Sequence, residues 1–267
     1  DERKAFGAQI NTVKDEISAA LEAKKADLQN AALDARLATE VLDVSLPVRP
    51  EAKGSLHPIS QTMEELTAIF GAMGFEVAEG PDVEDDFHNF TALNFPADHP
   101  AMELHDTLYL EGGGLLRTHT SPVQVRTLQK YAPPVRILAP GNVYRRDFFD
   151  ATHSPMFAQI EGLAVDEGIN FADLKATLTH FAHRFYGATR RTRFRPSFFP
   201  FTEPSAEMDV EVDLGDGRGL RWVEIMGCGL VHPAVLTEAG VDSERYTGWA
   251  VGMGPARMAQ SGYGVRD

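Results

Sequence analysis

A β-hairpin in the last third of the chain is the feature that most restricts the fold. Two strand-like runs, residues 208–214 and 220–226, are joined by the turn residues Gly215-Asp216-Gly217. Earlier strand-like runs lie at residues 75–78, 108–110, 136–139 and 162–165. Because these strands form hairpins and do not strictly alternate with helices, they predict an antiparallel sheet flanked by helices, which is an α+β fold.

Two amphipathic helices are predicted beside these strands. The first follows Pro58 over residues 59–73, where apolar side chains share one face and Gly74 ends the pattern. Thr62 and Glu65 are expected to form a capping box in this helix. The second helix begins after Asn170 as its N-cap and ends at Gly187.

The N-terminal segment differs from the rest of the chain. Residues 1–43 contain no proline and are rich in good helix formers. Apolar residues recur there at intervals of three and four positions, at Ile10, Val13, Ile17, Leu21 and Leu28, with Lys24 interrupting the series. This spacing is typical of a coiled coil or helical hairpin. Because the segment holds more acidic than basic residues, a packing arm is favoured over an RNA-binding arm.

A linker separates this arm from the remainder. Residues 46–54 contain two prolines and a glycine, so regular secondary structure is expected to stop there. The sequence therefore predicts a helical arm with the start of a linker over residues 1–45 and a larger domain over residues 46–267.

The charge and cysteine content restrict the function. The 267 residues include 25 Lys+Arg and 39 Asp+Glu, and this net charge of -14 argues against a nonspecific nucleic-acid binder. A specific RNA partner bound by a local patch or by another subunit stays open. The single cysteine, Cys228, excludes a disulfide scaffold and a cysteine-built zinc site within the chain. With no long apolar run and no signal peptide, we expect a cytoplasmic protein without membrane association.

Arginines are the candidate phosphate ligands, because no glycine-rich phosphate-binding signature is found in the sequence. Arg145 precedes a loop and a predicted returning strand, in which Phe157, Gln159 and Glu161 share one face by period-two geometry. Arg257 follows the closely spaced Gly252 and Gly254. A solvent-exposed role for each arginine, or a purely structural Arg145–Glu161 pair, stays open on these patterns alone.

In this order the segments resemble the class II aminoacyl-tRNA synthetases. Residues 59–81 resemble motif 1, residues 144–161 resemble motif 2, and residues 252–257 resemble motif 3 of that class. Longer blocks stand nearly as in bacterial phenylalanyl-tRNA synthetase alpha subunits, at residues 116–124, 150–153, 193–205 and 227–233. The resemblance extends over essentially the whole chain and includes the end of the helical arm.

This resemblance implies the activation of phenylalanine with ATP, followed by transfer to the terminal adenosine of tRNA(Phe). It implies Arg145 and Arg257 as catalytic arginines, with ATP held by Arg145, His153, Phe157, Gly252, Gly254 and Arg257. The implied phenylalanine pocket consists of His119, Ser121, Gln124, Gln159, Glu161, Phe199, Phe201 and Ala250. Glu203 is the implied Mg²⁺ ligand, and the implied partner is a beta subunit in a complex of two alpha and two beta chains.

Some positions depart from the pattern of the family. Alanine stands at Ala158, where histidine is usual, and at Ala256, where glutamate is common. By strand alternation Ala158 is expected to point away from the substrate. Phe199 and Phe201, two positions apart, are expected on one face, although a Phe-Phe-Pro-Phe run is more often core than pocket.

Two rival functions remain. One is a ligase of the same fold that acts on another amino acid or on a protein lysine. The other is a catalytically inactive class II synthetase paralogue that serves as a binding module.

Overall fold

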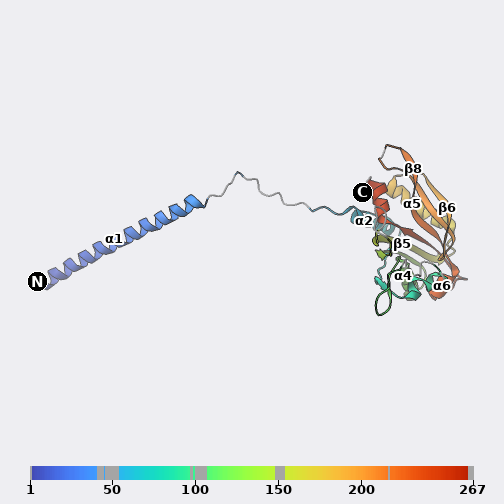
Figure 1. Ribbon diagram of the computed structural model, residues 1–267, viewed down its shortest axis with the longest axis horizontal. Helices are drawn as coiled ribbons and strands as arrows, with labels where there is room; N and C mark the ends of the chain where they lie inside the picture. Colours follow the sequence, from blue (N-terminus) through green and yellow to red (C-terminus); the bar gives the residue numbers. More distant parts are fainter. Residues whose placement is uncertain are drawn as a thin grey trace. The chain divides into compact units, whose positions relative to one another are not determined.

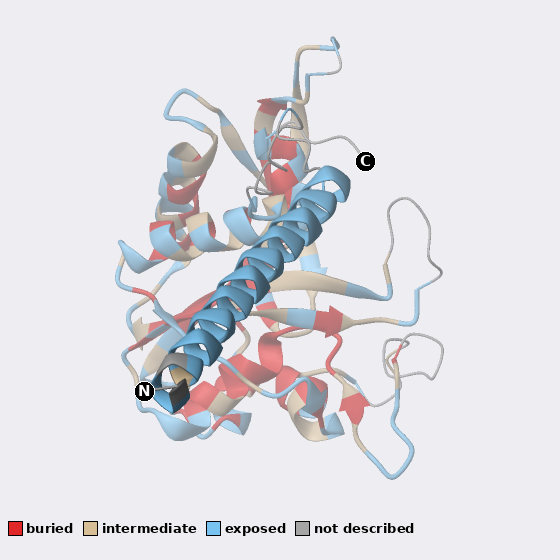
Figure 2. Ribbon diagram, turned by 90° about the vertical axis from the view of Figure 1, so that its left-hand side faces the viewer, coloured by how far each residue is buried: buried red, intermediate tan, exposed pale blue. Residues whose placement is uncertain are grey.

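The computed structural model describes residues 2–40, 45, 54–96, 99, 107–147, 154–215 and 217–263. The chain divides into two compact units, Asp1–Gly54 and Ser55–Asp267. In the first unit the helix α1 (Glu2–Thr39) carries exposed apolar side chains such as Ile10 and Leu21. Figure 2 shows this helix in the pale blue of exposed residues along its length. None of the helices in the described ranges is long and apolar enough to cross a membrane.

A seven-stranded sheet forms the centre of the second unit (Figure 1). Its order is β1-β4-β5-β9-β8-β7-β6, and every neighbouring pair is antiparallel except β1 and β4, which are parallel. The strands are β1 (Glu76–Val77), β4 (Val135–Tyr144), β5 (Met156–Glu167), β6 (Thr192–Phe199), β7 (Thr202–Asp213), β8 (Leu220–Val231) and β9 (Tyr246–Met253). The predicted α+β class is therefore confirmed, and β7 and β8 form the predicted hairpin.

Helices cover both faces of this sheet. The helices are α2 (Pro58–Gly71), α3 (Asp86–Asn89), α4 (Ser121–Lys130), α5 (Phe171–Tyr186), α6 (Pro233–Glu238) and α7 (Pro255–Tyr263), with a 3-10 turn η1 (Thr91–Leu93). One core cluster packs α2, α5 and α7 against the sheet through residues such as Phe70, Phe181 and Met258. A second cluster on the other face packs η1, α4 and α6 through Leu93, Leu128 and Leu236.

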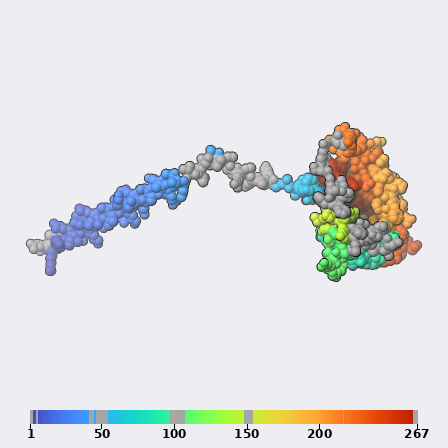
Figure 3. Space-filling model, viewed as in Figure 1, coloured from blue at the N-terminus to red at the C-terminus, as the bar shows by residue number. Residues whose placement is uncertain are grey.

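Most of the buried residues, drawn red in Figure 2, lie in these strands and helices, and some lie in the segments that connect them. In the space-filling view of the second unit, green residues from the middle of the chain lie at the lower left (Figure 3). Orange residues of the late strands lie at the upper right of the same view.

Local capping explains where the two predicted helices begin. Asn170 caps α5 as predicted, because its side chain accepts from the Ala172 amide while Asp173 accepts from the Asn170 amide. The capping box predicted for α2 is wrong. His57 is the N-cap and accepts from the Ile59 amide, whereas the Thr62 hydroxyl donates to the Pro58 carbonyl one turn earlier.

The strands of the structure differ from the predicted ones in two further respects. Residues 108–110 form no strand of their own, and only Tyr109 makes an isolated bridge, to Leu115 in the short strand β3 (Leu115–Leu116). This β3 pairs with β2 (Val83–Glu84) in a separate two-stranded sheet. The strands β6 and β9 were not predicted, because their charged and glycine residues hide the apolar alternation. The predicted domain boundary near residue 45 falls in a segment that lies mostly outside the described residues.

Candidate active site

A cavity of about 800 Å³ opens on the sheet face opposite α2 and α5. Its walls come from the segment before α4, the ends of β4 and β5, the β6–β7 turn, and the middle of β8 and β9. Most of the residues proposed from sequence line it, namely His119, Gln124, Arg145, Gln159, Glu161, Phe199, Phe201, Ala250 and Gly252. The volume lies within the range of roughly 300–1,000 Å³ that is usual for small-molecule sites.

Glu161 is the buried acid of this cavity. Strand alternation on β5 directs Gln159 and Glu161 to the cavity, while Ile160 joins the core on the opposite face, as the period-two pattern predicted. The Glu161 carboxylate accepts hydrogen bonds of 2.6 Å from the Ser121 hydroxyl and 2.6 Å from the Gln124 amide, both on α4. Burial raises the pKa of Glu161 to about 7, although these two hydrogen bonds oppose the shift.

Arg145 lies beside this acid, just beyond the end of β4. Its Nε donates to the Thr118 carbonyl at 3.0 Å, and its guanidinium lies over the Phe157 ring, 5.1 Å from the centroid. Burial lowers the pKa of Arg145, and the charges of Asp147 and Glu161 oppose this shift. Among the described residues, Arg145 is therefore held by Thr118 and Phe157, whereas Glu161 is held by Ser121 and Gln124. These contacts argue against an Arg145–Glu161 ion pair as the only role of Arg145.

Two cavity side chains hold buried polar atoms without a partner in the described part of the chain. Both ring nitrogens of His119 and the Gln159 Oε1 make no hydrogen bond there. Burial, aided by the charge of Arg145, lowers the pKa of His119 to about 3, so this imidazole is neutral. Because unpaired buried polar groups are costly, these atoms indicate a site that a polar ligand completes.

Aromatic rings form the opposite wall. Phe199 and Phe201 stack with centroids 5.8 Å apart, and Phe95 lies 6.0 Å from Phe201. The two rings lie on one side of the sheet, as predicted, but strand alternation is not the reason. Strand β6 ends at Phe199, and Phe201 belongs to the turn before β7. Phe95 also stacks on His119 at 5.9 Å and was missed in the sequence, where it lies outside every predicted strand and helix.

Acidic residues at the far side of the cavity were also missed. Glu207 on β7 and Glu224 on β8 both line it. The Arg257 guanidinium on α7 lies 3.1 Å from Glu224 Oε1, so this motif 3 arginine reaches the cavity wall through a carboxylate. Alternation along β7 would have placed Glu207 and Asp209 on one face, but only the pairing of β7 with β8 brings Glu224 beside them.

The remaining candidates lie away from the lining. Ser121 acts through Glu161. Phe157 lies near the start of β5 and Gly254 directly follows β9, and neither lines the cavity. Glu203 is exposed and outside the cavity, with its Oε2 3.4 Å from His232 Nε2, so its role as a metal ligand stays a prediction. His153 lies outside the described residues.

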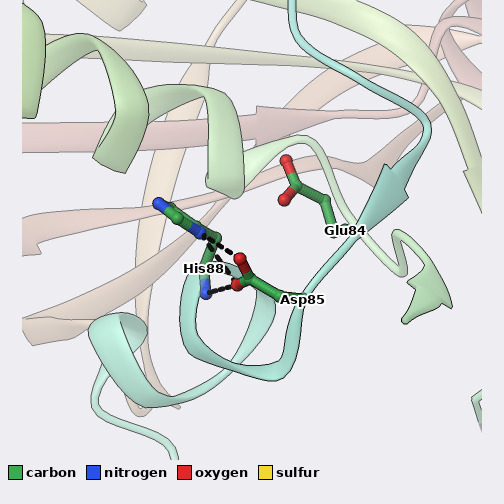
Figure 4. Close-up of side chains that lie close together, drawn as sticks. All are labelled: Glu84, Asp85 and His88. Carbon is green, nitrogen blue, oxygen red and sulfur yellow. Dashed lines mark hydrogen bonds and ion pairs between the residues drawn. The ribbon is translucent and has the colours of Figure 1, made fainter. Parts of the chain in front are cut away.

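A second group of ligand-type side chains lies near the start of α3. Glu84, Asp85 and His88 come close together, as Figure 4 shows. Their atoms are already engaged, because Asp85 caps α3 and accepts from His88, while Glu84 accepts two bonds from Arg126 of α4. This group therefore joins α3 to α4, the helix that carries Ser121 and Gln124 to the cavity.

Comparison with known proteins relates both units of the chain to one class. The family "tRNA synthetases class II core domain (F)" matches residues 41–267, and the family "Aminoacyl tRNA synthetase class II, N-terminal domain" matches residues 1–37. The phenylalanine–tRNA ligase alpha subunit of Gemmatimonas aurantiaca is 64% identical over 267 residues, which are 100% of this chain and 78% of that relative.

Two further proteins extend this comparison. The phenylalanine–tRNA ligase alpha subunit of Azotobacter vinelandii is 55% identical over 273 residues, with 100% of this chain and 80% of the relative covered. Pyrrolysyl-tRNA synthetase from Desulfitobacterium hafniense matches with a TM-score of 0.57 at 16% identity, covering 75% of this chain and 67% of that one. This last similarity concerns the fold alone.

Proposed function

The chain belongs to the phenylalanine–tRNA ligase alpha subunits among the class II tRNA synthetases, and we propose that its cavity activates phenylalanine with ATP. The product is phenylalanyl-adenylate, with release of pyrophosphate, and the acyl group then passes to the terminal adenosine of tRNA(Phe). The observation that carries this proposal is the buried Glu161 between Ser121 and Gln124, facing a cavity with an aromatic wall.

The amino acid is bound through its two charged groups and its ring. Glu161 pairs with the ammonium group, since a buried carboxylate without a cation of its own is costly. Gln159 and His119 have polar atoms that bond to no other described residue and can bind the same ligand. The ring lies against Phe199 and Phe201, in offset or edge-to-face contact, and ends near the small side chain of Ala250.

The first step is an in-line attack at the α-phosphorus of ATP. A carboxylate oxygen of phenylalanine forms a bond to this phosphorus, while the bond to the bridging oxygen breaks and pyrophosphate leaves with its electron pair. Arg145 holds the amino-acid carboxylate and the α-phosphate together, because its planar guanidinium can bind both oxygens in fixed geometry. Arg257 holds the terminal phosphate, and adenine lies near Phe157.

In the second step a ribose hydroxyl of the tRNA attacks the acyl carbon, and AMP leaves. A beta subunit in a complex of two alpha and two beta chains is proposed to complete the enzyme and to provide much of the tRNA contact. The acidic net charge of this chain supports a partner that provides the basic surface.

Mg²⁺ fits the oxygen donors of this cavity. Glu207 and Glu224 both line it and offer the hard carboxylate oxygens that Mg²⁺ prefers. They are the residues that would hold the ion, which when bound neutralises phosphate charge. Glu203 remains the candidate from sequence for a metal ligand outside the cavity.

The proposed function is tested by amino-acid-dependent exchange of pyrophosphate into ATP. We expect exchange with phenylalanine and little with the other nineteen amino acids when the beta subunit is present, and almost none with the isolated chain. Exchange driven by another amino acid would favour a ligase of different specificity. No exchange at all by the complete enzyme would favour the inactive paralogue, although Arg145 and Arg257 both argue against that alternative.

Ala250 is expected to limit the length of the bound ring. Its side chain is buried at the cavity wall, so Ala250→Gly makes room for one small substituent. We expect the glycine variant to gain about 10- to 200-fold in kcat/KM for para-chlorophenylalanine relative to phenylalanine. Ala250→Val is expected to raise the KM for phenylalanine. Exchange kinetics with both amino acids measure these effects.

The matched control is Ala164→Gly on β5, because Ala164 is equally buried but belongs to the core on the opposite face. If Ala250 only packs ahead of the turn into α7, both glycine variants would lower the melting temperature. An unchanged ratio between the two substrates would then reject the pocket assignment.

A further inference from the structure

Three arginines, two on β6 and one just before it, face three acids of β7 on the cavity side of the sheet. Arg195 is the cross-strand partner of Glu207, and Arg193 is that of Asp209. One step farther from the cavity, Arg191 makes two hydrogen bonds of 2.9 Å and 2.6 Å to Glu211. All three acids lie on β7, but only Glu207 of the three lines the cavity.

The guanidinium of Arg195 is held in place by the buried carboxylate of Asp209. Its Nε and Nη2 donate to the two oxygens of Asp209 at 2.8 Å and 2.9 Å. The Asp209 side chain is only 2% exposed and also accepts from Arg193. The hydrogen bond from Arg195 contributes most to the lowering of the Asp209 pKa, so this anchor is ionised at neutral pH. A bidentate pair of this kind fixes the orientation of the guanidinium.

From this anchored position Arg195 reaches both cavity acids. Its Nη2 lies 2.9 Å from Glu207 Oε2 and 3.3 Å from Glu224 Oε2. The other oxygen of Glu224 lies 3.1 Å from Arg257 Nη1. Glu224 is therefore shared between Arg195, which does not line the cavity, and Arg257, the proposed ligand of the terminal phosphate.

We propose that Arg195 is a positioning residue that holds Glu207 and Glu224 in place and leaves Arg257 available to ATP. This inference rests on the proposed ATP site. When a phosphate draws Arg257 away from Glu224, Arg195 remains as the counter-charge of that carboxylate. Without Arg195, Arg257 is the one remaining arginine among the described contacts of Glu224, and ATP must compete with that ion pair for Arg257.

The test uses Arg195→Gln in the complete enzyme. Arg191→Gln is the matched control, because Arg191 directly precedes β6 and pairs with Glu211, which does not line the cavity. We expect Arg195→Gln to weaken ATP binding about tenfold at low Mg²⁺, which is within the usual range of coupling between neighbouring groups. The KM for phenylalanine is expected to stay unchanged. Added Mg²⁺ should reduce the difference in ATP affinity between the variant and the wild type, because a cation can replace part of the positive charge lost between Glu207 and Glu224.

Three measurements separate positioning from a structural role. Calorimetry gives the Kd for ATP with and without Mg²⁺, exchange kinetics give KM and kcat for each substrate, and a thermal melt gives stability. Arg195→Lys is the second variant. It keeps a positive charge near Asp209 but cannot reach three carboxylates in the same geometry, so the same ATP defect is expected in a folded protein.

Other results would overturn the inference. If Arg195→Gln binds ATP as Arg191→Gln does, Arg195 does not position the cavity acids. If Arg195→Gln weakens the binding of ATP and of phenylalanine equally, and added Mg²⁺ does not restore ATP binding, the role of Arg195 is structural only. Absence of exchange in the wild-type enzyme would instead reject the proposed function, and this inference with it.

Discussion

Replacement of Arg145 by alanine is expected to slow adenylate formation by about 10²- to 10³-fold while the protein stays folded. The loss of one preorganised donor to developing charge typically costs about 2.7–4 kcal/mol of transition-state stabilisation. Arg145 is held by the Thr118 carbonyl and by the Phe157 ring, and neither contact joins two core elements. Exchange of pyrophosphate into ATP measures the rate, and a thermal melt measures stability.

Arg136→Ala is the matched control for this variant. Arg136 lies on β4, the strand that Arg145 directly follows, is half exposed, and pairs with Asp166 at 3.5 Å outside the cavity. We expect this control to retain the exchange rate of the wild type. If Arg145→Ala instead melts early and keeps a nearly normal rate, its role is structural and the catalytic assignment is wrong.

Glu161→Gln is expected to lower kcat/KM for phenylalanine by about 10²-fold or more, with little change in the KM for ATP. The variant keeps the shape of the side chain but removes the charge that pairs with the substrate ammonium group. Loss of one partner from a buried charge pair typically costs about 2–5 kcal/mol. Measurement of both KM values in the same exchange assay distinguishes a phenylalanine-site defect from a general loss of activity.

The pH dependence gives an independent test of Glu161. Its pKa of about 7 in the free protein means that only the ionised fraction is ready to bind the ammonium group. Below pH 7, kcat/KM for phenylalanine should therefore fall about tenfold for each pH unit, and above pH 7 it should level off. Glu161→Gln should remove this dependence. A wild-type profile that is flat between pH 5.5 and 8 would contradict the assignment.

The free energy of unfolding should change with pH in the opposite direction to kcat/KM, so that ionisation of Glu161 lowers stability. Because the pKa of Glu161 is higher in the folded protein than its ordinary value of 4.5, ionisation favours unfolding. The contribution of Glu161 is fully present below pH 4.5 and is lost as the pH rises to about 7. Glu161→Gln is thus expected to melt no lower than the wild type at pH 8. Glu167→Gln, at the exposed end of the same strand, is the control and should change neither profile.

The parts of this protein that the sequence alone determines are those with short-range causes. The cap at Asn170, the β7–β8 hairpin and the alternation of Gln159 and Glu161 depend on a few neighbouring residues, whose backbone periodicity and side-chain hydrogen bonds act locally. The family resemblance of the sequence also indicated Arg145, Glu161 and Ala250, and all three line the cavity.

The contacts between residues far apart in the chain follow from the tertiary fold. Phe201 reaches the cavity from a turn, Phe95 from a loop, and Glu224 from a strand whose neighbour is set by sheet pairing. Likewise, the start of α2 depends on His57 and not on the local Thr62–Glu65 pattern. Contacts between strands far apart in the chain arise from the register of the sheet, and no local periodicity encodes that register. The contacts of Arg195 with Asp209, Glu207 and Glu224 depend on this register and are therefore not visible in the sequence.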